Sequence, residues 1–148
     1  MAALLAVAAT GCGGHRDAAS DPHGLNWKQY NGEYFRETHK LQLAPGFRWP
    51  ARAPIAGSYQ GAAVYFEAGS GKRDADRYWF CSWARRWLGD RGSSVALRKL
   101  WTIKRTFLYQ GATLPHDRHL YDDEITRAGL GDAGPLQNDV QLNCPKPA

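Results

Sequence analysis

The feature that most constrains this fold is a set of tryptophans spaced four residues apart. Trp79, Trp83 and Trp87 recur at helical spacing within residues 72–88. At 100° per residue the three indoles fall within an arc of about 80°, with most basic side chains on the other side. The spacing predicts an amphipathic helix whose aromatic face supplies the core of a small domain.

Two further helices are predicted after this one. Residues 95–109 carry an apolar stripe, and Ser93 or Ser94 before them suits a helix N-cap. The linker between the first two helices is short, which predicts that they pack as an antiparallel hairpin. Residues 117–129 predict a third, shorter helix, and the Gly-, Pro- and Asn-containing stretch from residue 131 onward predicts an extended tail.

The preceding part, residues 25–71, is predicted to be irregular or extended. Residues 34–43 show partial alternation, residues 47–54 are spaced by prolines that exclude a helix, and residues 58–67 predict a second strand. With 43% apolar and 22% charged residues the chain is expected to fold. The predicted fold is therefore mainly α with a small extended or β portion, as one domain over residues 25–148.

The first dozen residues carry a different pattern. Residues 2–9 (AALLAVAA) are apolar but too few to span a bilayer, which needs about 20 residues. Their length suits the apolar region of a signal peptide. The tetrad that follows, Ala9-Thr10-Gly11-Cys12, resembles the lipobox of bacterial lipoproteins, although Ala9 stands where leucine is commoner and no Lys or Arg precedes the apolar run.

This resemblance concerns residues 1–12 and implies where in the cell the protein is located. It implies that Cys12 is the lipid-attachment site, which anchors the chain at the extracytoplasmic face of the bacterial cell membrane. Residues 13–24 are rich in Gly, Ala and Asp without periodicity, which predicts a flexible tether. The alternative is an ordinary apolar N-terminal tail with a structural cysteine.

The chain has three cysteines, Cys12, Cys81 and Cys144. If Cys12 carries lipid, an even pair remains, and export places that pair where disulfides persist. A Cys81–Cys144 disulfide would fasten the C-terminal tail to the first predicted helix, on the flank of its aromatic stripe. The alternative is two unrelated thiols.

The net charge of +5 favours an anionic partner. Residues 72–105 contain ten Lys or Arg and three Asp, which predicts a basic outer face on the hairpin. The expected partners are the membrane, through the anchor, and an anionic wall polymer, a headgroup or another envelope protein. Nucleic acid is not expected, because the tryptophans lie opposite the basic residues and the chain is exported. The cations of the predicted contact face are Arg77, Arg85, Arg98 and Arg105.

The predicted function is a non-catalytic binding or scaffold module, without cofactor, catalytic residues or metal. The chain lacks a G-x-S-x-G elbow. The alternative is a small envelope hydrolase or metal-dependent enzyme that uses His116, His119 and Asp123, because a helix brings these residue types together. The simpler explanation of that cluster is a helix start at which Asp117 is the cap. A solvated, partly paired hairpin surface likewise remains the alternative to the basic contact face.

Overall fold

The computed structural model describes residues 24–55 and 57–147. Cys12 and the predicted tether, apart from Gly24, lie outside the described residues. The described part is mainly helical with one very small hairpin of strands, so the predicted fold class is confirmed. Its elements, in chain order, are α1 (Trp27–Thr38), β1 (Ser58–Tyr59), β2 (Ala62–Ala63), α2 (Ser70–Gly89), α3 (Ser94–Trp101), η1 (Thr102–Arg105), η2 (Leu108–Ala112), η3 (Pro115–Asp117), α4 (Arg118–Gly129) and α5 (Gly134–Asn143).

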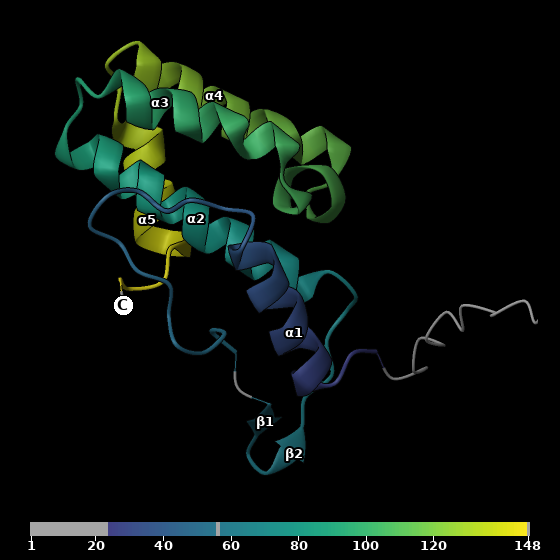
Figure 1. Ribbon diagram of the computed structural model, residues 1–148. Helices are drawn as coiled ribbons and strands as arrows, with labels where there is room; N and C mark the ends of the chain where they lie inside the picture. The colour runs from purple at the N-terminus through teal and green to yellow at the C-terminus, as the bar shows by residue number, and fades with distance from the viewer. Residues whose placement is uncertain (1–23, 56, 148) are drawn as a thin grey trace, which may run out of the picture.

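The long helix α2 is the centre of the fold. Helices α1, α3 and α5 pack against it, and α4 bridges α3 and α5 (Figure 1). The stripe of Trp79, Trp83 and Trp87 is buried, with no more than 4% of any of the three exposed. The indoles pack with apolar side chains of α3, α4 and α5 in one cluster. The predicted aromatic core is therefore confirmed.

The predicted antiparallel hairpin is formed by α2 and α3 (Figure 1). Ser93 caps α3, because its side chain accepts a hydrogen bond from the backbone N–H of Ala96. The single helix predicted over residues 95–109 is wrong in its second half. The hydroxyls of Thr102 and Thr106 donate to carbonyls three residues earlier, and Thr106 is extended, so the chain continues as the 3₁₀ helix η1 and then the π-helix η2.

Helix α1 covers residues 34–38 of the extended segment predicted over residues 34–43, so that prediction is wrong in its first half. Asn26 and Gln29 form a reciprocal capping box at its start. Tyr30 and Tyr34 bury one face of α1 against α2. The contact is close because Gly71 of α2 has no side chain, and a Cβ there would lie 2.3 Å from the Tyr30 carbonyl oxygen. The aromatic side chains on this helix face produce an apolar pattern that resembles the alternation of a strand.

The second predicted strand, residues 58–67, is also wrong in extent. The chain instead turns at Gln60 and Gly61, which both have positive φ, and forms the two-residue antiparallel pair β1–β2. Further on, Phe66 exchanges two backbone hydrogen bonds with Leu25. These bonds fix the start of the described chain beside α2.

The end of the chain differs from its predicted extended form, because residues 134–143 form α5. The Asp132 side chain accepts from the backbone N–H of Gly134, and Pro135 occupies the first turn, where a missing N–H costs nothing. Leu136 is fully buried and holds α5 to the core. The third predicted helix is confirmed as α4, which ends at the predicted Gly129.

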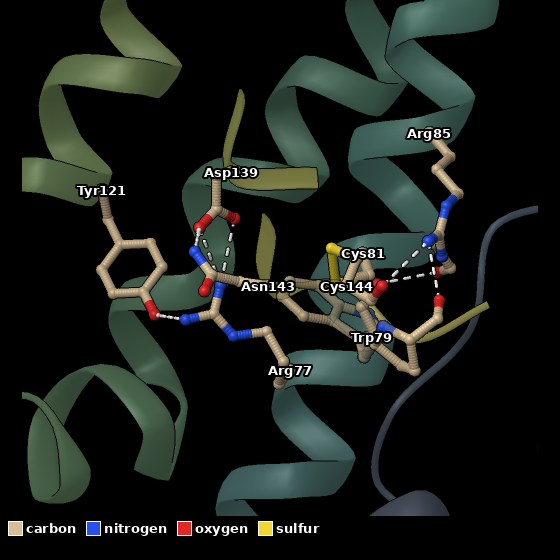
Figure 2. Close-up of a disulfide and its surroundings, with 10 residues drawn as sticks. Arg77, Trp79, Cys81, Arg85, Tyr121, Asp139, Asn143 and Cys144 are labelled. Atoms are coloured by element: carbon tan, nitrogen blue, oxygen red, sulfur yellow. Dashed lines mark hydrogen bonds and ion pairs between the residues drawn. A yellow bond between two sulfur atoms is a disulfide. The ribbon is translucent and has the colours of Figure 1, made fainter. Parts of the chain in front are cut away.

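Cys144, the residue after α5, forms a disulfide with Cys81 of α2, as predicted (Figure 2). Disulfides persist in oxidising compartments, so the bond indicates an oxidising, extracytoplasmic environment. No helix within residues 24–55 and 57–147 has both the length and the apolar character needed to cross a bilayer.

Candidate functional site

Arg77 lies where α2, α4 and α5 meet, beside the disulfide (Figure 2). Its guanidinium donates to the Asp139 carboxylate, 3.0 Å away, and to the Tyr121 hydroxyl. The same guanidinium lies over the Tyr121 ring, with Cζ 5.3 Å from the ring centroid. Asn143 donates to Asp139 from the next turn of α5. Arg77 thus links three helices and is half-buried, away from the open face predicted for it.

The predicted contact face is divided into two parts. Arg85 donates to the backbone carbonyl oxygen of Pro145 at 2.6 Å and, at 3.5 Å, to that of Cys144, so it holds the C-terminal tail (Figure 2). Arg98 and Arg105 are exposed, and neither has a carboxylate partner among the described residues. Two of the four arginines therefore stabilise the fold, and two remain available to a partner.

A pocket of about 260 Å³ opens beside Arg77. It brings one guanidinium and three carboxyl groups together with an apolar side chain, a phenol, a hydroxyl and an amide. The walls come from α2, α4, α5 and the turns before α4. Its lining residues are Arg77, Thr113, Asp117, Leu120, Tyr121, Glu124, Asp139 and Asn143.

Glu124 is the unusual group in this pocket. Only 7% of it is exposed, and it has neither a hydrogen bond nor an ion pair with any described residue. Burial, assisted by the nearby negative charge of Asp139, raises the pKa of the Glu124 carboxyl to about 8. Sequence reasoning missed this residue. The available signal was a glutamate on the apolar face of the third predicted helix, between Tyr121 and Ile125.

The cluster predicted for the alternative enzyme does not converge. His116 and His119 are both exposed, and the Nδ1 atom of His119 lies 2.6 Å from the His116 carbonyl oxygen. Asp123 is exposed and lies 3.9 Å from Arg127. In the part of the chain that the structure describes, no group of three or more His, Cys, Asp or Glu is arranged to hold a metal ion.

The exposed face of α1 carries a second candidate site. Lys28, Gly32 and Arg36 follow one another at four-residue spacing, which places them on one face of the helix. They line a groove of about 460 Å³, and the Arg36 guanidinium lies against Gly32. Neither cation has a carboxylate partner among the described residues. Glu33 also lines the groove, but its carboxylate is hydrogen-bonded to the start of α2, where it accepts from the backbone N–H groups of Gly69 and Gly71.

Trp27 and Trp49, which precede the tryptophan stripe of α2 in the chain, are partly packed inside the fold. Trp27 is 38% exposed, and its indole N–H donates to the Ile55 carbonyl oxygen. Trp49 is half-buried between the rings of Tyr34 and Tyr78. The structure does not bring the two indoles together in one of the described pockets.

A buried acid also lies at the centre of the fold. Asp76 of α2 is fully buried, and its Oδ2 atom accepts from the backbone N–H of Leu108, at the start of η2. Its Oδ1 atom has no hydrogen-bond partner within residues 24–55 and 57–147. Burial raises the pKa of Asp76 to about 6, against the opposing effect of the Leu108 hydrogen bond.

Comparisons of the chain with family models, with curated proteins and with solved structures returned no match.

Proposed function

We propose that this protein is a lipid-anchored, non-catalytic binding module of the cell envelope that holds to an anionic membrane surface. The observation that carries the proposal is the pair of exposed cations on α1, Lys28 and Arg36, which flank a groove and have no acidic partner among the described residues. Arg98 and Arg105 add exposed positive charge from α3 and η1.

The cysteine pairing supports the anchor. Of the three cysteines in the chain, the disulfide uses Cys81 and Cys144 and leaves Cys12. Cys12 is the residue at which the lipobox-like tetrad would be acylated, and the disulfide fits the exported environment that acylation requires. The pairing thus leaves this cysteine for lipid attachment.

The position of α1 favours phospholipid headgroups as the anionic partner. Helix α1 is the first helix after the proposed tether of residues 13–24, which reaches at most about 40 Å when extended. An anchored domain would therefore stay close to the bilayer surface. A basic patch near an anionic membrane contributes about 1 kcal/mol per Lys or Arg, in addition to the lipid.

Replacing Cys12 by alanine is expected to remove the lipid and release the protein from the membrane. The measurement is incorporation of labelled palmitate into the protein in cells, together with its distribution between membrane and soluble fractions. Replacing Cys81 and Cys144 by serine is the matched control, because this double variant also loses cysteine residues but keeps Cys12. Unchanged labelling of the Cys12→Ala protein would contradict the anchor.

The groove on α1 is tested by the double change Lys28→Ala with Arg36→Ala. Binding of the unacylated full chain to vesicles is measured with phosphatidylglycerol and, to subtract the contribution of the apolar segment, with phosphatidylcholine alone. We expect the charge-dependent affinity to fall about thirtyfold, since two cations contribute about 2 kcal/mol.

The matched control is Lys104→Ala with Arg127→Ala, which changes the net charge equally. These two cations already pair with Asp122 and Asp132. The control is expected to bind the anionic vesicles nearly as well as the unchanged protein. An equal loss in both double variants would mean that net charge and not the α1 groove determines binding.

A further inference from the structure

The pocket between α2, α4 and α5 has an unbalanced charge. Its guanidinium, Arg77, is already engaged by Asp139 and by the Tyr121 hydroxyl. Asp117 lies at the rim, with its Oδ1 atom 3.5 Å from the Nε2 atom of His116. Glu124 has no partner among the described residues. Of the three carboxyl groups of the pocket, only Asp139 is paired with its single guanidinium, so two are left without a basic group of the pocket.

A carboxyl group that is largely withdrawn from water and has no protein hydrogen-bond partner is costly to bury, because little replaces its hydration. Glu124 is only 7% exposed, yet it borders a pocket and is not enclosed by apolar side chains on every side. An N–H donor entering the pocket would therefore supply the missing hydrogen bond. A positively charged donor would also offset the excess of acidic groups.

The other walls suit an organic part of the same ligand. Leu120 is 59% exposed and forms an apolar border, and the Tyr121 ring lies beneath the Arg77 guanidinium. The volume of about 260 Å³ accommodates a small molecule of several non-hydrogen atoms. The disulfide holds α5 beside α2, so the walls are fixed before a ligand enters.

We propose that this pocket binds a small primary alkylammonium ion, with the ammonium group against Glu124 and the alkyl chain against Leu120. An anion is disfavoured, because the only guanidinium of the pocket is neutralised by Asp139. The proposal is independent of the membrane contact of α1, which uses other residues.

Binding is expected to release a proton. The charged groups facing Glu124 are Arg77 from α2, Asp139 from α5 and Asp123 from its own helix, with Asp117 across the pocket. The pKa of Glu124 is raised to about 8, so much of the carboxyl is protonated at neutral pH. An ammonium ion pairs with the carboxylate form, and the displaced proton passes to the buffer. Affinity should therefore rise with pH up to about 8.

The test is isothermal titration calorimetry of the full chain with n-butylammonium chloride, in buffers of different ionisation enthalpy. Binding in the millimolar range with proton release supports the proposal. Titration with n-butanol provides the matched neutral probe, and magnesium chloride provides an inorganic cation. Butanol binding as tight as butylammonium binding would overturn the proposal, as would binding of magnesium alone or of none of the three probes.

Glu124→Gln is expected to weaken butylammonium binding at least about tenfold and to abolish the proton release. The glutamine side chain has nearly the same shape as glutamate but cannot carry its negative charge. Asp90→Asn, which removes an exposed carboxylate at the end of α2 outside the pocket, is the control and should change the affinity little. If Glu124→Gln does not fold, Leu120→Trp takes its place, since it fills the pocket from the exposed side and should block binding. Unchanged binding in either folded variant would overturn the proposal.

Discussion

Replacing Cys81 and Cys144 together by serine is expected to lower the free energy of unfolding by about 4 kcal/mol. The two cysteines are 63 residues apart, and opening a loop of that length returns its conformational entropy to the unfolded chain. For a small domain this is a large part of the total stability. Urea unfolding followed by tryptophan fluorescence measures the change, because the core tryptophans become exposed.

The same variant should loosen α5 before the rest of the fold. Without the bond, α5 keeps its buried Leu136 and the ion pair between Arg77 and Asp139, but its end is free. Amide hydrogen exchange in residues 134–143 is therefore expected to accelerate most. Cys12→Ser is the matched control and should leave the unfolding midpoint unchanged. A midpoint of the double variant equal to that of the control would contradict a stabilising role for the disulfide.

Replacing Asp76 by asparagine is expected to remove a loss of stability of about 2 kcal/mol that the unchanged protein undergoes between pH 4 and pH 7. The pKa of Asp76 is about 6 in the folded protein, against 3.8 in its ordinary state. The folded state therefore binds the proton more tightly than the unfolded state. The unchanged protein loses stability as the pH rises from about 4 through 6, and asparagine, which does not titrate, removes that loss.

The measurement is the free energy of unfolding at several pH values for both proteins. Asparagine retains an oxygen that accepts from the Leu108 N–H, so the bond to η2 is kept. Asp123→Asn serves as the control at an exposed site and should leave the pH profile as it is. Glu124, whose pKa is raised from 4.5 to about 8, lowers the stability of both proteins alike as the pH rises from about 4.5 through 8, so the difference between the two proteins isolates Asp76. An Asp76→Asn protein with the original slope between pH 4 and 6 would contradict the assignment.

The sequence predicted the elements whose stabilisation is local. The tryptophan spacing was enough for α2, because a stripe at 3.6-residue period has one simple explanation, and Ser93 and Gly129 marked two helix ends. Helix α1 was missed, although Asn26 and Gln29 carry the capping-box pattern, because its buried face is aromatic and resembles a strand. Helix α5 was missed because the glycine, proline and asparagine residues from residue 131 onward favour an extended tail.

The candidate site depends on contacts that no local pattern contains. Arg77 and Asp139 are 62 residues apart in the chain, and only the packing of α5 on α2 brings them together. The sequence therefore placed Arg77 on an outer basic face. The environment of Glu124 has the same origin, since its burial requires α4 and α5 to lie side by side. Lys28 and Arg36 were overlooked because the helix that aligns them was not predicted.

The disulfide also determines how this molecule transmits mechanical load. Cys81 lies in the second half of α2, and Cys144 precedes the C-terminal tail. When the chain is pulled from its two ends, the covalent path crosses from one sulfur to the other and bypasses α3, α4 and α5. Tension instead reaches the hydrogen bonds between Leu25 and Phe66 and the contact of α1 with α2. Under pulling, the N-terminal half would yield first, and the loop that contains most of the pocket would stay unextended.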